Sequence, residues 1–494
     1  MFPRRLAASL LPFLASPVVA AVPTYSTFEL QARSEFVSGY NLPAGSSFNS
    51  GTPTLNDDAT LSFRLIVVGN TGNAGLWVGA GGSGGVVYHA PANWLLSDPT
   101  INSAGKVVFE QADIGISDGV LLYDPVTGNT TQRVAPGGIY GINSFGSPQI
   151  NDSDVVGFRA NQGSQYAYFF DTAGTQTPVA VMGGGVAYLF SPQFNNSSQF
   201  AAKVRLGTTA EASPDEIRRY QPNGLYLVMA EDDDSNPLSP FTSFQNGVGF
   251  SNSGLVAFVA NAGGGTGVYL ANGSSVIPIA TTADPDVSGI DFFAPVVNDA
   301  GLVAFRGYDA AGLRAIFAGD GTTLRRVIGE HDLIRTDLGQ ARIDQHDSSP
   351  VFGGTVDINS HGDIAFAATL TPPDDNQIEW GTGMFIAYAD GDVSAPTPAV
   401  ARLAAPSPNP FVERTTISFR VPRAGIATVD VYDVSGRRLR TLASGPVAEG
   451  THDVVWDGLT SAGVPAPAGV YFVRLTSPGE TPASRRVVRL RDRP

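Results

Sequence analysis

The chain has 494 residues, a formal net charge of −15 and no cysteine. This length exceeds what one hydrophobic core serves and indicates two or three domains. The lack of cysteine excludes disulfides and thiolate chemistry. The acidic excess excludes nucleic acid as a partner, because phosphates need a basic protein face.

The N-terminus has the pattern of a secretory signal peptide. Two arginines at positions 4 and 5 precede an apolar run over residues 6–19, and small residues follow it. This predicts a signal peptide over residues 1–21, with an uncleaved anchor as the alternative. No later segment reaches 18 apolar residues, so no transmembrane segment is predicted. We therefore expect a protein that is secreted or held at the outer cell surface.

A repeat fills the middle of the chain. The pattern Pro-x-apolar-Asn-x-x-Gly-x-apolar-small-Phe occurs seven times at intervals of 44 to 61 residues, most clearly at 99–109 and 295–305. The asparagine position holds Asn56, Asn102, Asn151, Asn195, Asn298 and Asn359, and Ser251 in the remaining copy. The asparagine can close a turn on its own backbone, and the glycine allows the positive φ of a tight hairpin. The small residue would allow a neighbouring sheet to approach closely.

Two further strand-like segments follow each copy, which gives about four strands per repeat. Glycine and proline are abundant, at 57 and 35 residues, and long helical periodicity is absent. These features predict an all-β fold, with a seven-bladed β-propeller over residues 22–390 and six or eight blades as alternatives. Residues 25–33 have strand character without a motif, and we expect them to complete the last blade. The repeats also resemble a bacterial tandem-repeat family named for its Asn-x-x-Gly-x-x-Ala-Phe motif, which implies architecture only.

Residues 391–407 are rich in proline and alanine and are interpreted as a linker. The segment 408–494 carries 409-NPF-411, 432-YD-433, 436-GR-437, 456-WDG-458 and 469-GVY-471. About seven short strands separated by turns predict a small Ig-like β-sandwich. The motifs resemble the C-terminal sorting domain of type IX-secreted bacterial proteins, and equally the Ig-like module of the flagellar hook-capping protein. The resemblance implies a sorting or anchoring role and the secretion machinery as a partner.

The densest polar stretch lies before the seventh repeat copy. Two histidines and several carboxylates there could bind a divalent cation, and the candidate ligands are His331, Asp332, His346 and Asp347. The alternative is a solvated acidic loop. No other cofactor is indicated.

Aromatic residues offer a second candidate site. Trp77 and Trp456 fall in predicted strands and are expected to pack in cores, whereas Trp94 and Trp380 fall in loops and are candidates for ligand contact. The segment 81-GGSGG-85 formally matches a nucleophile elbow but is flanked by strands on both sides, which argues against that role.

The sequence identifies no catalytic residue and leaves enzymatic activity open. The function it favours is an exported binding protein for a carbohydrate or a surface protein. The alternative is a secreted polysaccharide lyase or hydrolase with carboxylates in the propeller channel, which would need two carboxylates about 5–10 Å apart.

Overall fold

The computed structural model describes residues 22–34, 39–48, 51–113, 116–163, 165–209, 213–345, 350–390, 402–403, 406, 408–421, 425–447, 450–476 and 483–491. The predicted signal peptide and most of the predicted linker lie outside these residues. Across the described ranges the chain is all-β, as predicted, apart from a 3-10 turn at Gly69–Thr71 (η1). No helix in this part of the chain is long and apolar enough to cross a membrane.

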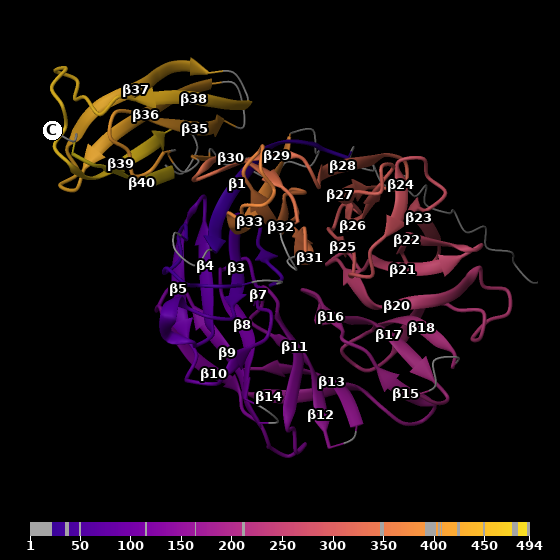
Figure 1. Cartoon of the computed structure of the whole chain (residues 1–494). Coiled ribbons are helices and arrows are strands. Elements are labelled where there is room, and N and C mark those ends of the chain that lie inside the picture. Colours follow the sequence, from indigo (N-terminus) through magenta and orange to yellow (C-terminus); the bar gives the residue numbers. More distant parts are fainter. Residues whose placement is uncertain are drawn as a thin grey trace, which may run out of the picture.

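Seven antiparallel sheets surround a common axis, and they succeed one another around it in chain order (Figure 1). This arrangement confirms the seven-bladed propeller. Blades 1 to 3 consist of β2 (Thr54–Leu55), β3 (Thr60–Leu65), β4 (Gly75–Ala80) and β5 (Ser83–His89); β6 (Leu95–Leu96), β7 (Thr100–Ile101), β8 (Val107–Asp113), β9 (Ile116–Asp124) and β10 (Asn129–Val134); and β11 (Ser144–Ile150), β12 (Val156–Gln162), β13 (Gln165–Thr172) and β14 (Thr175–Val181).

The next three blades repeat this order, with the first strand innermost. They consist of β15 (Val186–Leu189), β16 (Gln193–Phe194), β17 (Phe200–Leu206), β18 (Asp215–Tyr220) and β19 (Tyr226–Glu231); β20 (Phe241–Phe250), β21 (Val256–Ala262), β22 (Gly265–Ala271) and β23 (Val276–Thr281); and β24 (Val287–Ile290), β25 (Val296–Val297), β26 (Val303–Asp309), β27 (Arg314–Gly319) and β28 (Leu324–Gly329).

The seventh blade joins the two ends of the propeller. It contains β31 (Phe352–Ile358), β32 (Ile364–Thr371) and β33 (Gly381–Asp390), and its outer strand is the N-terminal β1 (Thr24–Ser34). β1 pairs antiparallel with β33 from Thr24 to Ser34. The prediction that the first strand completes the last blade is therefore confirmed. A hairpin of β29 (Leu333–Thr336) and β30 (Gly339–Ile343) extends the same sheet.

The C-terminal region forms a two-sheet sandwich beside β1 and the β29–β30 hairpin (Figure 1). One sheet contains β34 (Arg402–Leu403), β35 (Thr415–Val421) and β38 (Gly450–Trp456), and the other β37 (Arg438–Val447), β36 (Gly425–Asp433), β39 (Gly469–Thr476) and β40 (Ala483–Arg489). Trp456 is fully buried between the sheets and donates from Nε1 to the Leu459 carbonyl at 3.0 Å. Its predicted place in the core is confirmed.

The turn after each inner strand is built on the repeated asparagine. Asn102 Oδ1 accepts the N–H groups of Ala104 and Lys106 at 3.1 and 3.0 Å, so its side chain closes the turn as expected. The residue three positions later is in the left-handed region in all seven copies, including the four glycines. The copies that lack glycine hold the same conformation with Ala59, Asp154 or Ser198, which costs each on the order of 1 kcal/mol.

The asparagine amides also link the blades into a ring. Each amide donates to the backbone carbonyl of the equivalent residue in the next blade, at 3.1 to 3.5 Å: Asn56 to Asn102, Asn102 to Asn151, Asn151 to Asn195, Asn195 to Ser251, Asn298 to Asn359, and Asn359 to Asn56. Ser251 has no amide, and at this junction Ser253 instead donates its N–H and hydroxyl to Asp299. These contacts form what we call the asparagine ring.

Apolar residues fill the space between blades. In five copies the motif phenylalanine stacks on an aromatic ring of the following strand, as Phe63 does on Trp77 at 4.8 Å between centroids. Trp77 is fully buried, so its predicted core role is confirmed. A β-carbon at Gly157 would lie 2.4 Å from the Phe194 ring of the next blade. The small motif position therefore does permit close approach of the neighbouring sheet.

Basic side chains directly after the last motif position, which is phenylalanine in three of these four copies and Ala202 in the other, make a second set of links between blades. Each reaches the irregular part of the next inner strand: Arg64 to the Leu96 carbonyl, Arg159 to Leu189, Lys203 to Phe244, and Arg306 to Gly354. The sequence analysis did not anticipate these links.

The asparagine ring predicts a specific loss of stability. Asn102→Ala removes two acceptor bonds within the turn and two donor bonds to the next blade, to the Asn151 carbonyl and Asp154 Oδ1, so we expect the free energy of unfolding to fall by about 1–3 kcal/mol. Chemical denaturation of the variant measures this. Asn376→Ala, at an exposed loop position, is the control and should leave stability unchanged. Equal denaturation curves for both variants would contradict a contribution of the asparagine ring to stability.

Candidate functional site

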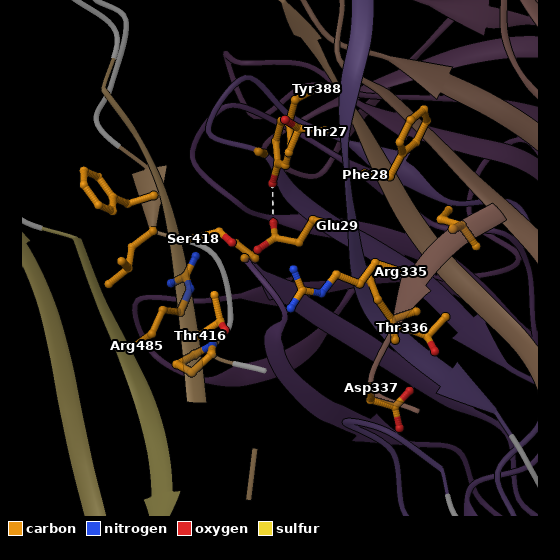
Figure 2. A pocket seen from close by; sticks show the side chains of 18 of the residues that line it. Thr27, Phe28, Glu29, Arg335, Thr336, Asp337, Tyr388, Thr416, Ser418 and Arg485 are labelled. Atoms are coloured by element: carbon orange, nitrogen blue, oxygen red, sulfur yellow. Dashed lines mark hydrogen bonds between the residues drawn. The ribbon is translucent and has the colours of Figure 1, made fainter. Parts of the chain in front are cut away.

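A cavity lies between the propeller and the sandwich and is called the junction pocket. Its volume is about 680 Å³, within the range of ligand-binding pockets. The propeller wall comes from β1, the β29–β30 hairpin, Tyr388 of β33 and the turns at 57–59 and 80–81. The opposite wall comes from β34, β35, β38 and β40 of the sandwich (Figure 2).

Glu29 of β1 is the distinctive group of the junction pocket. Its side chain is buried, and Oε2 accepts the Tyr388 hydroxyl at 2.5 Å and the Gln31 amide at 3.1 Å. The other oxygen, Oε1, is buried without a hydrogen-bond partner among the described residues. An unpartnered buried carboxylate oxygen is costly, because desolvation is not compensated. A donor from a bound molecule would remove that cost.

Two arginines enter the junction pocket from opposite walls (Figure 2). Arg485 of β40 packs so closely on Gly81 that a β-carbon there would overlap its guanidinium. Its Nε is buried without a hydrogen-bond partner in the described chain. Arg335 of β29 is exposed, and within the described residues it has no ion pair.

Most carboxylates of the junction pocket already have partners. Asp337 forms a bidentate pair with the buried Arg33 at 2.8 and 2.9 Å, and Asp453 accepts the Ser418 hydroxyl. Burial, reinforced by the charges of Glu29 and Asp337, raises the pKa of Tyr40 to about 12, while Arg485 opposes the shift. Charged groups of both the propeller and the sandwich therefore affect the pKa of Tyr40.

The second cavity is the propeller channel, with a volume of about 390 Å³. Polar side chains of its inner strands accept N–H groups across blade junctions: Thr54 from Ile101, Thr100 from Ile150, Gln149 from Phe194, and Asp357 from Leu55. At one mouth, Asp57, Asp152 and Asp299 accept the N–H groups of Ser360, Ser103 and Ser253. These carboxylates hold blades together.

Asp357 of β31 is a titratable group of the propeller channel. Neighbouring strands surround it, and burial raises its pKa to about 6, although the N–H groups of Leu55 and Ile358 oppose the shift. The folded protein therefore favours the protonated form. This carboxyl group contributes stability at low pH that is lost as the pH rises from about 4 to about 6.

The residues predicted to bind a divalent cation do not form one cluster in the described structure. Glu330, His331 and Asp344 offer ligand atoms within 4.8 Å of one another, but the buried Asp344 also lies 3.1 Å from Arg342 Nε, whose charge opposes a cation. Asp332 instead pairs with Arg326 at 2.6 Å. His346 and Asp347 lie outside the described residues, and the cation site stays a prediction.

The loop tryptophans are half-buried. Trp94 packs on the core between blades 1 and 2, and Trp380 packs on the core of blade 7, where its carbonyl accepts Arg33 Nη1 at 2.7 Å. Neither lines the two cavities described above. Their role in ligand contact stays a prediction. Gly81 and Gly82 form the turn between β4 and β5, and Ser83 begins β5, so the segment is a hairpin and no nucleophile elbow.

The sequence analysis missed Glu29 and Arg485. A weak signal for Glu29 exists, since it is the one charged residue among the first nine of β1, a strand that was expected to complete the last blade. No local signal marks Arg485, because its role depends on how the two domains meet.

Asp357→Asn tests the role of channel burial. We expect the stability of the variant relative to the wild type to be about 1–3 kcal/mol higher at pH 7–8 than below pH 4, because the variant lacks the cost of a buried charge. The amide can accept only one of the two N–H groups, which adds a loss of stability that does not depend on pH. Denaturation curves across this pH range measure the pH-dependent difference, with the exposed Asp374→Asn as control. A gap that stays constant with pH would contradict the raised pKa.

No curated protein matches the chain in sequence. Similar solved structures include PorZ, a surface component of the type IX secretion system of Porphyromonas gingivalis, with 11% identity, a TM-score of 0.38 and coverage of 91% of this chain and 60% of that one. The chain thus spans 60% of the length of PorZ.

Two further structures are comparably similar. An oligogalacturonate lyase in complex with manganese has 9% identity, a TM-score of 0.44 and coverage of 73% and 91% of the two chains. The extracellular domain of a protein described as a hybrid two-component system from B. thetaiotaomicron has 10% identity, a TM-score of 0.43 and coverage of 96% and 60%. In sequence, residues 412–480 match the family model of the FlgD Ig-like domain, which confirms the Ig-like part of the predicted resemblance.

Proposed function

We propose that the protein is an exported binding protein, secreted or held at the cell surface, that takes its ligand in the junction pocket. The observation that carries this proposal is the buried Glu29 carboxylate, whose Oε1 has no partner among the described residues and which lines a 680 Å³ pocket. The free protein bears the cost of this oxygen. A ligand with a hydrogen-bond donor would offset it, and both domains would contribute to binding.

A catalytic channel is less well supported. The alternative of a polysaccharide lyase or hydrolase needs carboxylates that are available as acid, base or nucleophile. Asp57, Asp152 and Asp299 each use an oxygen to accept a backbone N–H of the adjacent blade, and Asp357 accepts two N–H groups. Their geometry supports a structural role, which favours binding over catalysis.

The proposal that the protein is exported rests on two sequence patterns, one near each end of the chain. Residues 1–21 have the pattern of a signal peptide, and the Ig-like module resembles domains that direct secretion. We propose that this module addresses the propeller to the secretion machinery. Its 13 arginines against 8 acidic residues over 400–494 set it apart from the acidic propeller.

Mass spectrometry of the protein exported by its native host tests this part. We expect an N-terminus near Ala21 or Val22 and loss of the C-terminal module on export. A retained residue 1–21 segment would contradict the signal peptide. A C-terminus still at Pro494 would contradict processing as a sorting domain and leave anchoring as the role of the module.

Ligand binding is tested by screening the full mature chain on a glycan array and measuring the affinity of each hit. We expect Glu29→Gln to weaken binding by about tenfold or more, because a charged acceptor is lost while the bond from Tyr388 can persist. Glu413→Gln, at an exposed position of the Ig-like module, is the matched control. Hits whose affinity is the same in the wild type and in Glu29→Gln would refute the junction pocket as the binding site.

A further inference from the structure

We propose that the junction pocket binds an acidic saccharide, whose anionic group lies between Arg335 of the propeller and Arg485 of the Ig-like module. This inference rests on the proposed function and specifies the ligand. It follows from three groups. Glu29 Oε1 has no hydrogen-bond partner among the described residues, Arg335 makes no ion pair there, and Arg485 has an unpartnered Nε and donates from Nη1 only to the Ser484 carbonyl.

The arginines determine the charge of the ligand. Figure 2 shows Arg335 and Arg485 extending into the pocket from opposite walls, with Glu29 beside the space between them. Four aspartates line the pocket and could have neutralised them. Asp337 is taken by Arg33, Asp453 by Ser418 and Asp57 by the Ser360 N–H. The fourth, Asp58, is exposed and makes no ion pair among the described residues. Planar guanidiniums bind carboxylates and sulfates through paired hydrogen bonds. Two such groups without a carboxylate partner among the described residues therefore indicate an anion.

Glu29 requires a hydrogen-bond donor on the ligand, close to its anionic group. Its free oxygen needs a donor close to that anion, and an anion alone would be repelled by the carboxylate. A sugar ring that carries a carboxylate or sulfate offers both features, since its hydroxyls donate hydrogen bonds. The sandwich wall adds the hydroxyl of Thr416, which can donate and accept. A uronic acid or sulfated sugar fits this combination of groups.

The two domains must act together in this site. Arg335 belongs to the β29–β30 hairpin of the propeller and Arg485 to β40 of the Ig-like module. A ligand held by both links the modules through its own anionic group. Loss of either arginine should therefore weaken the same interaction.

Isothermal titration of the full mature chain tests the proposal with four probes. These are a uronic acid tetrasaccharide, the same tetrasaccharide after reduction of its carboxylates to alcohols, a sulfated tetrasaccharide and a glutamate-rich tetrapeptide. We expect an acidic sugar to bind, and carboxyl reduction to weaken binding by about tenfold or more. Stronger binding of the sulfated probe would support the proposal with sulfate as the anion.

Arginine variants locate the anion. Arg335→Ala and Arg485→Ala should each weaken binding of the acidic sugar by about tenfold and leave the reduced sugar unaffected. Arg486→Ala is the matched control, because its exposed side chain lies on the other face of β40. Melting curves verify that each variant is folded. Arg335→Lys, which keeps the charge but cannot form paired bonds, should be intermediate and keeps the test valid if an alanine variant unfolds.

The outcomes separate this inference from the proposed function. If the reduced sugar binds as well as the acidic one and only Glu29→Gln weakens binding, the acidic class is wrong while the pocket stands. If the peptide binds and no sugar does, the saccharide class is wrong. If no probe and no array glycan binds, or if binding ignores Glu29, Arg335 and Arg485 alike, both proposals fail.

Discussion

The hydrogen bond from an asparagine amide to the backbone of the next blade is the contact on which the propeller depends. Each blade is a separate antiparallel sheet of four to six strands, and the asparagine both shapes its inner turn and binds that turn to its neighbour. One residue type thus sets local backbone conformation and the spacing of blades. The closing bond, from Asn359 to Asn56, completes the circle between the last and first turns.

Packing between blades follows from that spacing. Inner strands fixed at a short separation leave room for a small residue on one side of each sheet and for a stacked aromatic pair on the other, as with Gly157 and the pair Phe158 and Phe169. The turn of blade 1 that belongs to the asparagine ring also forms part of the junction pocket wall. The geometry at the axis is thereby transmitted to the candidate site.

Local chemistry explains which features could be predicted from the sequence. The Asn-x-x-Gly spacing contains the whole turn, so the strands, the positive φ and the blade count followed from it. The aromatic partners of the motif phenylalanines and the arginine links between blades depend on strand register and were missed. Glu29 and Arg485 lie near opposite ends of the chain, and only the docking of two domains brings them to one pocket. The polar stretch near His331 was recognised, but the hairpin fold directs Asp332 to Arg326 and places Asp344 beside the histidine.

The N-terminal strand has two tasks that cannot be separated. β1 closes the seventh blade along its whole length against β33, and the same strand carries Glu29 into the junction pocket. The pocket also needs β40, the last strand of the described chain. A partly made or partly folded chain therefore has no pocket, because its walls come from the first and last strands. Under the proposed function, only a molecule whose ring is closed and whose two modules have docked binds the ligand.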